Sequence, residues 1–452
     1  MEESLSRFPE TVKQNGHCPA RIDHLSGRCY SPRAMAHEQP TKVLLVAFAD
    51  DAAAAVYVIN RLQPEALCFV LPESAKGQVE LAVQPNIEHM PRRWDWVTLA
   101  DTADVAACHH ALVGALPDLL KTWDVHSGDL VLDLTGSTPA MAGALTLVTL
   151  PISSRTVALL PWSEGEESEP IPLNGRSMRW AQGNLWDDVA LVSRHEAAEL
   201  FNRGMYSPSA RLFREIETRV SGGQKPTYRA FADLAEGYEF WERFHYRQAW
   251  DKLKTATKAL EMASLWGGPP GLKAVLPEIK ANAGFLERLV LDPAAVKDSL
   301  SLDLLAHVNR RLHVAHDPEA AMIALVRALE SFAQRLLFKQ HKIKTWDVQP
   351  EQLPQILQEA CRTSWLNDVD GKYNMPLQSQ FRALAELGDP LGHAFVRDWL
   401  TMKPLLDAAN HSVLGHGFEP VKAERVQQLY DIVLKLTGVT ESSLPKFPTL
   451  AL

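Results

Sequence analysis

The chain has 452 residues, of which 46% are hydrophobic and 22% are charged, so it is long enough to bury two ordinary hydrophobic cores. Its formal net charge of -9 argues against a protein that holds nucleic acid through overall basic character, so any such contact must be local. No apolar stretch reaches the roughly 18 residues that suggest a membrane-spanning helix, and the first residues lack a secretory signal. We therefore expect a cytoplasmic protein.

The cysteines indicate neither a disulfide framework nor a zinc site. None of the five forms a CxxC pair, and no histidine cluster stands at zinc-ligand spacing near them. Cys68 lies within an apolar run, which is typical of a buried free thiol. The five positions are Cys18, Cys29, Cys68, Cys108 and Cys361.

The first half of the chain alternates between expected strands and expected helices. Residues 1–40 are polar, without a sustained period, and predict an irregular arm. Apolar runs predict buried strands at 42–49 and 129–135, and further strands are expected at 66–71, 94–99 and 155–160. Helices are expected at 49–63, at 101–123 and from Pro139 onward. This alternation predicts an α/β, Rossmann-like domain with a mostly parallel sheet over 41–186, in which the acidic segment 162–175 is a surface stretch or a hairpin.

The second half, 187–452, is predicted to be all-α. Helical segments are expected at 194–220, 227–263, 272–292, 298–316, 318–342, 350–361, 376–387, 391–410 and 420–437. Three stretches resemble one another, each with a helix end, a short turn with an aromatic residue or His, and a new amphipathic helix: 201–216, 242–257 and 310–328. Their spacings are unequal, which favours an irregular helical bundle over a regular repeat array.

Residues 131–145, VLDLTGSTPAMAGAL, form the most informative stretch of the first half. The expected strand brings Asp133 and Thr135 to its carboxyl end, Gly136 permits a tight turn, and Pro139 suits the first turn of the next helix. A helix N-terminus at this edge of an α/β sheet is a usual place for a phosphate or nucleotide. An ordinary capped turn without a ligand explains the same residues equally well. The pattern is neither GxGxxG nor Walker A, which disfavours a dehydrogenase or P-loop ATPase.

This stretch resembles the signature of CARF domains, the CRISPR-associated Rossmann folds, in which a strand is followed by D-x-T-G-[GS]-T and then x-x-M. The resemblance implies a dimer that binds cyclic oligoadenylate across its axis, with cyclic tetra-adenylate or hexa-adenylate as the activating ligand. Ser137 replaces a second glycine, and Pro139 replaces a frequent lysine, which removes one phosphate contact. The matching positions are Asp133, Thr135, Gly136, Ser137, Thr138 and Met141. The loop after the first strand contributes as well in this family, here Ala47, Phe48, Ala49 and Asp50.

Near the C-terminus, DAANHSVLGHGF (407–418) gathers polar groups at an expected helix end. Histidine is the side chain best suited to proton transfer near neutral pH, so His416 is a candidate general acid or base. Taken alone, however, the stretch is more simply a helix C-cap containing Gly415 and Gly417, with a solvent-facing histidine.

In context the stretch resembles the catalytic loop of HEPN ribonucleases, RN-x-S-x-x-[AG]-HG. The matching residues are Asn410, Ser412, Gly415, His416 and Gly417, while Ala409 occupies the position of the motif arginine. The resemblance implies a composite site of two protomers, whose Arg and His orient the ribose 2′-OH and stabilise the phosphorane without a metal. Ala409 removes the guanidinium, the strongest electrostatic stabiliser. Two explanations remain open: the arginine of an active enzyme has been replaced, which we favour, or the chain is a degenerate nuclease that only senses its ligand.

Other Arg–His spacings fit the loose rule as well. They join Arg310 or Arg311 to His316, and Arg335 to His341. Because 309–336 resembles the structural helix pair of the HEPN family, we expect these side chains to cap helices, form ion pairs or face water.

The two resemblances together imply a homodimeric, metal-independent endoribonuclease of type III CRISPR antiviral defence. It would cut single-stranded RNA to 2′,3′-cyclic phosphate ends once a cyclic oligoadenylate binds the sensor domain, with no further cofactor and no membrane partner. The alternative is a catalytically silent sensor or scaffold that binds the same ligand.

Overall fold

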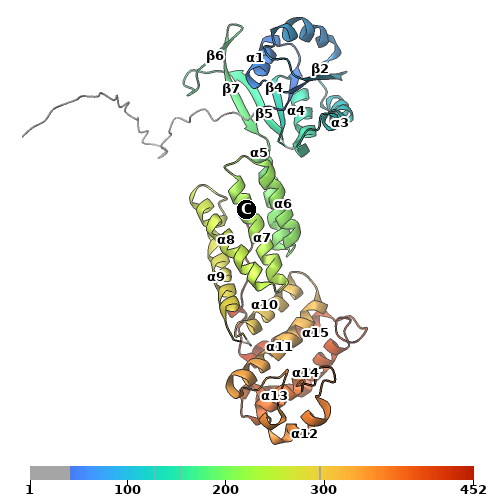
Figure 1. The fold of residues 1–452 in the computed structure, drawn as a ribbon, viewed down its shortest axis with the longest axis vertical. Helices are drawn as coiled ribbons and strands as arrows, with labels where there is room; N and C mark the ends of the chain where they lie inside the picture. Colours follow the sequence, from blue (N-terminus) through green and yellow to red (C-terminus); the bar gives the residue numbers. More distant parts are fainter. Residues whose placement is uncertain (1–40, 127, 153, 295–296) are drawn as a thin grey trace, which may run out of the picture.

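The computed structural model describes residues 41–126, 128–152, 154–294 and 297–452. The expected N-terminal arm, 1–40, lies outside the described residues, as do Cys18 and Cys29. Figure 1 shows an elongated molecule with an α/β part at one end and helices stacked below it along the long axis.

The α/β part is built on one seven-stranded sheet with the order β3-β2-β1-β4-β5-β7-β6. The first five strands of this order are parallel, while β7 is antiparallel to both β5 and β6. The strands are β1 (Val43–Phe48), β2 (Ala66–Pro72), β3 (Arg93–Leu99), β4 (Leu130–Gly136), β5 (Ser154–Pro161), β6 (Ile171–Leu173) and β7 (Arg176–Asn184). The Rossmann-like prediction is confirmed, and the acidic segment leads into a hairpin, one of its two predicted forms.

Both faces of the central strands are covered, which explains their continuous apolar sequences. On β1, Leu45 packs with helices α3 (Val105–Thr122) and α4 (Pro139–Thr149), whereas Leu44 and Val46 pack with α1 (Ala52–Leu62) on the other face. Cys68 of β2 is fully buried and free, as predicted. Short turns of helix, which the sequence did not predict, join β2 to β3: Glu73–Ala75, Lys76–Gln78, Val79–Val83 and Gln84–Asn86.

The rest of the described chain is helical, as predicted. Its helices are α5 (Trp186–Asn202), α6 (Tyr206–Arg219), α7 (Lys225–Glu242), α8 (Tyr246–Leu265), α9 (Leu272–Leu291), α10 (Leu300–His313), α11 (Pro318–His341), α12 (Gln355–Ser364), α13 (Leu377–Glu386), α14 (Pro390–Asn410) and α15 (Ala423–Thr437). The three similar stretches are the α5–α6, α7–α8 and α10–α11 turns. Each turn contains one residue with positive φ, namely Gly204, Phe244 and His316.

The helices enclose two hydrophobic cores rather than one. We call them the proximal helical core, formed by buried residues between Trp186 and Leu289, and the distal helical core, formed between Leu304 and Leu444. The chain end then returns to the proximal core, where Leu450 is buried and its backbone N–H donates to the side chain of Asn202 at 2.7 Å. Figure 1 places the C-terminus beside α7 and α8.

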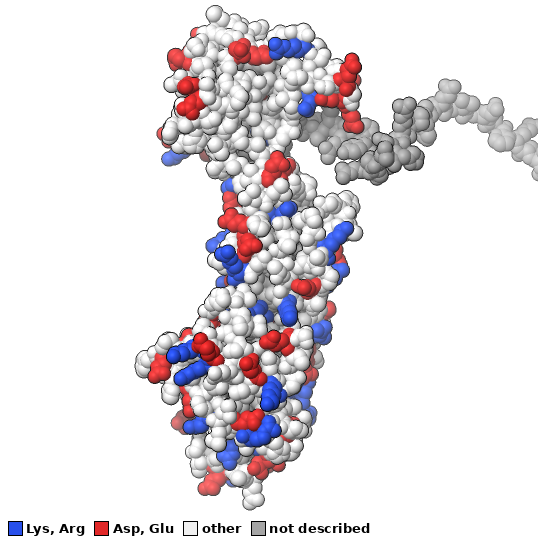
Figure 2. Space-filling model, turned by 180° about the vertical axis from the view of Figure 1, so that it is seen from behind, with Lys and Arg blue, Asp and Glu red and all other residues white. Residues whose placement is uncertain are grey.

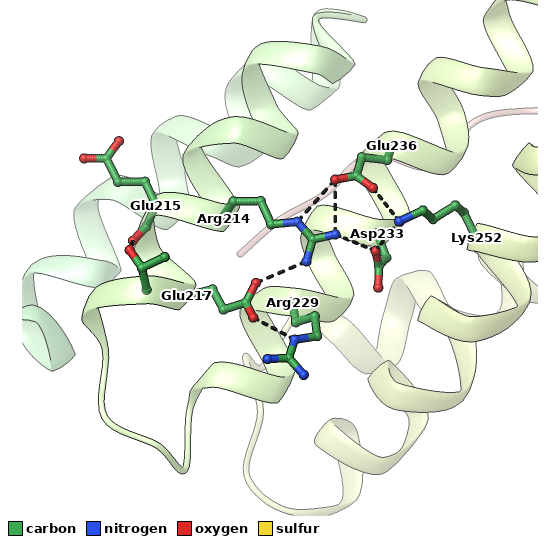
Figure 3. Close-up of polar contacts among 8 residues, drawn as sticks. Arg214, Glu215, Glu217, Arg229, Asp233, Glu236 and Lys252 are labelled. Atoms are coloured by element: carbon green, nitrogen blue, oxygen red, sulfur yellow. Dashed lines mark hydrogen bonds and ion pairs between the residues drawn. The ribbon is translucent and has the colours of Figure 1, made fainter.

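An ion network on the proximal helical core links α6, α7 and α8 (Figure 3). The Arg214 guanidinium contacts Asp233 at 2.6 Å and Glu236 at 3.1 Å, and Lys252 contacts the same two carboxylates. Because the two cations share both acids, the network links three neighbouring helices. On the face drawn in Figure 2, basic and acidic side chains are interspersed along the helical part.

Candidate functional site

The turn between β4 and α4 is held by its own side chains. Thr138 caps α4, because its Oγ accepts a hydrogen bond from the backbone N–H of Met141 at 3.2 Å, and its hydroxyl donates to the carbonyl of Thr102. The Ser137 hydroxyl donates to the Leu134 carbonyl at 2.7 Å. The turn therefore presents half-buried backbone at Gly136–Thr138 at the N-terminus of an 11-residue helix.

Asp133 anchors this turn from below. Its carboxylate is buried, and Oδ1 accepts from both the backbone N–H and the hydroxyl of Thr135, at 2.9 and 2.5 Å. The Thr135 hydroxyl in turn accepts from the N–H of Leu159 on β5 at 2.9 Å. Burial raises the pKa of Asp133 to about 6, although the two hydrogen bonds from Thr135 act in the opposite direction. Asp133 and Thr135 thus hold the strand ends together.

The loop after β1 lies directly beside this turn. The backbone N–H of Ala49 donates to the carbonyl of Gly136 at 3.0 Å, and a β-carbon on Gly136 would lie 3.1 Å from the carbonyl of Ala47. A side chain at Gly136 would therefore be tight against the neighbouring loop. Asp50 is exposed, whereas the side chains of Phe48 and Met141 are fully buried in opposite layers of the domain. Phe48 and Met141 could therefore contact a ligand only through their backbone atoms.

An open cavity of about 1160 Å³ adjoins the β1–α1 loop. It is lined by Asp50 and Asp51 at the start of α1, by Tyr57 and Asn60 further along that helix, and by Arg176 of the β6–β7 hairpin. The sequence did not single out Tyr57, Asn60 and Arg176, because none of them belongs to a recognisable motif. The cavity gives the α/β part room for a sizeable polar ligand.

The second candidate site is the loop that follows α14. The backbone N–H of His416 donates to the carbonyl of Asn410 at 2.8 Å, and the N–H of Ser412 donates to that of Ala409 at 3.3 Å. These bonds satisfy carbonyl groups that a helix C-terminus otherwise leaves without partners. The loop is thereby folded back onto the end of α14.

The two glycines of the motif are explained by close backbone approach. A β-carbon on Gly415 would lie 2.2 Å from the carbonyl oxygen of Ala409, and one on Gly417 would lie 2.2 Å from that of His411. Neither glycine has a positive φ, so the constraint is space and not backbone conformation. A side chain at either position would push the loop away from the helix.

The four predicted catalytic positions divide into two pairs. Asn410 and His416 are exposed, so their side chains are available to a substrate or a partner. Ala409 and Ser412 are buried, and the Ser412 hydroxyl accepts from the N–H of Gly415 at 3.0 Å. This geometry gives Ser412 a structural contact inside the loop. Large apolar side chains also lie exposed on the same loop: Val413, Leu414 and Phe418.

A carboxylate that the sequence did not point to closes the loop. Glu319, in the first turn of α11, accepts from the backbone N–H of Val421 at 2.6 Å and from that of Leu414 at 3.5 Å. It therefore holds both ends of the segment that carries His416. Glu319 and Val421 lie 102 residues apart in the sequence, so no local sequence pattern predicts their contact.

The alternative Arg–His spacings do not form the candidate site. Arg310 and Arg311 pair with Glu242 of α7, and His316 is exposed in the α10–α11 turn. Ion pairing and exposure to water are two of the roles that were expected for these side chains. Among the residues that the structure describes, no cluster of three or more His, Cys, Asp or Glu side chains suits a metal ion, and no helix is long and apolar enough to cross a bilayer.

The comparisons with known proteins match both helical cores. A family model described as the Csm6 6H domain matches residues 189–286, and one described as the Csm6 HEPN domain matches residues 297–440. A comparison with curated protein sequences found no match.

The solved structures that match this chain include the following two. Enterococcus italicus Csm6 bound to cyclic hexa-2'-fluoro-hexa-dAMP is 11% identical, covers 89% of this chain and 96% of its own, and has a TM-score of 0.54. Can2 from Sulfobacillus thermosulfidooxidans in complex with cyclic tetra-adenylate is 12% identical, covers 49% and 67%, and has a TM-score of 0.23. The first likeness supports the order of a Rossmann-like part followed by helices.

A Rossmann-like sheet followed by a helical part that matches a HEPN model defines a CRISPR-associated protein of the CARF–HEPN class. HEPN domains are generally ribonucleases, so the chain falls among nuclease-type proteins at this coarse level. The two Csm6 models together match more than half of the chain, and the chain belongs to the Csm6 family.

Proposed function

We propose that this protein is a cyclic-oligoadenylate-activated, metal-independent endoribonuclease of type III CRISPR defence, whose activity is removed by Ala409. The domains would be an arm at 1–40, a CARF sensor at 41–186 and a helical nuclease region at 187–452. Within that region, the two hydrophobic cores suggest a further division into a linking bundle and the HEPN domain.

For the sensor, the supporting observation is the half-buried turn Gly136–Thr138 at the N-terminus of α4, next to the exposed Asp50. Backbone N–H groups at a helix N-terminus favour a phosphate. The ligand-contacting positions would be Thr135, Gly136, Ser137, Thr138 and Met141 on one loop and Phe48, Ala49 and Asp50 on the other, with Phe48 and Met141 contributing backbone only. The two similar solved structures contain cyclic adenylate-type ligands, which suits this proposal.

For the nuclease, the carrying observation is that Asn410 and His416 are exposed on a loop that backbone hydrogen bonds fold against α14. His416 would move the proton between the ribose 2′-OH and the 5′-oxygen that leaves, and the reaction would yield a 2′,3′-cyclic phosphate. The exposed apolar residues Val413, Leu414 and Phe418 on the same loop suit contact with a second copy. A homodimer would then place two such loops in one shared cleft.

Ala409 leaves this centre without the cation that would stabilise the phosphorane. Ala409 is buried at the end of α14, next to the exposed Asn410. The test is the variant Ala409→Arg, assayed on single-stranded RNA in EDTA with cyclic tetra-adenylate or cyclic hexa-adenylate. We expect cleavage that depends on one of the two rings, and an increase of at least 10³-fold, roughly, over the present chain.

The matched control is the double variant Ala409→Arg/His416→Ala, which should return to the background rate. A silent sensor or scaffold is the second candidate function, and the absence of the arginine is the observation that favours it. That candidate predicts tight ring binding with no cleavage even after arginine is installed. Cleavage that survives the loss of His416 would refute the proposed chemistry.

A further inference from the structure

A cavity of about 300 Å³ lies at the base of the loop that follows α14. Part of its lining comes from the end of α14, with Asp407, and from the start of the loop, with His411. Another part comes from the end of the loop, with Glu419, and from the beginning of α15, with Lys422 and Arg425. Both ends of the candidate nuclease loop therefore border one hollow.

Backbone hydrogen bonds hold the frame of this cavity. The N–H of His411 donates to the carbonyl of Asp407 at 2.9 Å, and the N–H of Glu419 donates to that of His411 at 3.1 Å. In the first turn of α15, the N–H of Arg425 donates to the carbonyl of Lys422 at 3.0 Å. The residues that line the cavity are thus fixed relative to the rest of the loop.

The two cations of the lining are open to solvent and have no partner. Lys422 and Arg425 are both exposed, and within the described residues neither side chain forms an ion pair or a hydrogen bond. Other arginines of the distal helical core are engaged by carboxylates, as Arg327 is by Glu330 at 3.2 Å. The cavity therefore presents two cationic donors that are available to an external anion.

Two carboxylates line the same cavity and oppose these cations. Asp407 is already paired with Lys403 at 3.6 Å, whereas Glu419 is exposed. Three cations, Lys403 included, thus stand against two carboxylates, and His411 adds charge when it is protonated. In a chain whose formal net charge is -9, a local excess of positive charge is the feature that an RNA strand requires.

We propose that this cavity binds a backbone phosphate of the RNA strand, beside the phosphate that is cleaved. The proposal rests on the RNA substrate proposed above. The Arg425 guanidinium would donate two N–H groups to the phosphate oxygens, and the Lys422 ammonium would donate a third. His411, next to the exposed Asn410, would add a ring N–H. A strand held here lies against the loop that carries His416, and the contact reads no sequence because it involves no base.

The test is RNA binding by the full, unaltered chain, measured by fluorescence anisotropy of a labelled 2′-O-methyl oligoribonucleotide. This probe lacks the nucleophilic 2′-OH, so binding is measured without cleavage, both alone and with each cyclic adenylate ring present. Arg425→Gln should weaken binding about three- to tenfold. It should also lower the slope of log Kd against log salt by roughly 0.7, the contribution of one phosphate of a single strand. Lys422→Gln should act in the same direction.

The matched control is Arg382→Gln. Arg382 is also an exposed arginine of the distal helical core without a partner among the described residues, but it does not line the cavity. Its loss should leave the Kd within about twofold. Glu419→Gln removes the opposing carboxylate and should tighten RNA binding, which a role confined to folding would not do. All four side chains are exposed, so the melting temperatures should stay nearly unchanged.

Three results would overturn the proposal: no saturable RNA binding in any condition, equal weakening by Arg425→Gln and Arg382→Gln, or an unchanged salt dependence in Arg425→Gln. Complete displacement of the RNA by inorganic phosphate at constant ionic strength would assign the cavity to a free anion and overturn it as well. The proposed nuclease is tested separately. If the Ala409→Arg variant cleaves RNA equally well with Arg425→Gln added, only the phosphate site is wrong. If the chain binds RNA through Arg425 and the Ala409→Arg variant does not cleave it, the site stands and the nuclease is wrong.

Discussion

Glu319 accepts a hydrogen bond from the backbone N–H of Val421 at 2.6 Å, which ties the first turn of α11 to the end of the loop that carries His416. The same carboxylate reaches the N–H of Leu414, at 3.5 Å, at the other side of that loop. A single side chain therefore ties this loop to α11, in addition to the backbone hydrogen bonds that hold the loop to the end of α14. Placement of His416 depends on a residue outside the motif.

Replacing Glu319 in the Ala409→Arg variant should lower the rate of RNA cleavage strongly while changing the melting temperature little. In an Ala409→Arg background, Glu319→Ala should reduce the rate of RNA cleavage by as much as about 10²-fold, because the His416 loop loses its outer anchor. Glu319→Gln keeps an acceptor oxygen and should lose much less. Cleavage rates and melting temperatures of both variants check this, and equal rates for Ala and Gln would contradict a positioning role.

Gly415 and Gly417 should be intolerant of a methyl group. Gly415→Ala brings a β-carbon to within 2.2 Å of the Ala409 carbonyl unless the backbone shifts, so we expect a cost of about 1–3 kcal/mol and easier proteolysis within 411–421. Gly143→Ala in α4 is the matched control, since its β-carbon would meet nothing within 4 Å. That change should stabilise by about 0.5–1 kcal/mol. Thermal unfolding of the two variants should therefore move in opposite directions.

Much of the fold could be predicted from the sequence, because a strand buried on both faces is a continuous run of apolar residues. The apolar runs at 42–49 and 66–71 became β1 and β2, and Pro139 marked the first residue of α4. Helix α5 was expected only from residue 194, but it begins at Trp186. Its first turns carry Leu191 and Val192 on the exposed side, which hides the amphipathic period.

Contacts between distant segments could not be predicted in the same way. Glu242 and Arg310 lie 68 residues apart and meet only because the α7–α8 turn packs against α10. The division of 187–452 into two cores was also invisible, since helices of either core show the same apolar spacing. The candidate nuclease loop was located by its residue types, whereas its anchor at Glu319 required the tertiary fold.

Loss of the negative charge of Glu242 should lower the free energy of unfolding. Burial opposes ionisation of Glu242, but Arg310 and His307 outweigh it and lower its pKa to about 2. Its stabilising contribution is therefore present above about pH 4.5 and is lost as the pH falls toward 2. At neutral pH, Glu242→Gln removes the buried carboxylate that Arg310 and Arg311 share and should cost about 3–5 kcal/mol.

The matched control for that change is Glu351→Gln, which breaks an exposed pair with Arg362 at 3.0 Å. An exposed pair of this kind contributes about 0–1 kcal/mol, so the control should barely move the transition. Urea unfolding followed by tryptophan fluorescence is the measurement, because Trp241 donates to Asp303 within the same cluster. Similar midpoints for the two variants would show that the cluster is not a stabilising link.

The stabilising contribution of Asp133 depends on pH in the opposite direction to that of Glu242. Burial raises its pKa from 3.8 to about 6, so the folded protein holds this proton more tightly than the unfolded chain does. Its contribution to stability is full below about pH 4 and is lost as the pH rises through 6. Relative to Asp133→Asn, which cannot ionise, the unaltered protein should lose up to about 3 kcal/mol of unfolding free energy between pH 4 and pH 7.

The same proton should be linked to ligand binding if phosphates dock at the adjacent turn. A negative ligand beside Thr135–Thr138 disfavours the ionised form of Asp133, so binding should take up a proton near pH 6 to 7. Ring affinity of the unaltered protein should then fall as the pH rises from 5.5 to 7.5, by up to about tenfold for each pH unit, while that of Asp133→Asn stays nearly level. Calorimetry in two buffers of different ionisation enthalpy measures the proton directly. Identical pH profiles of ring affinity for the two proteins would contradict a link between ligand binding and protonation of Asp133.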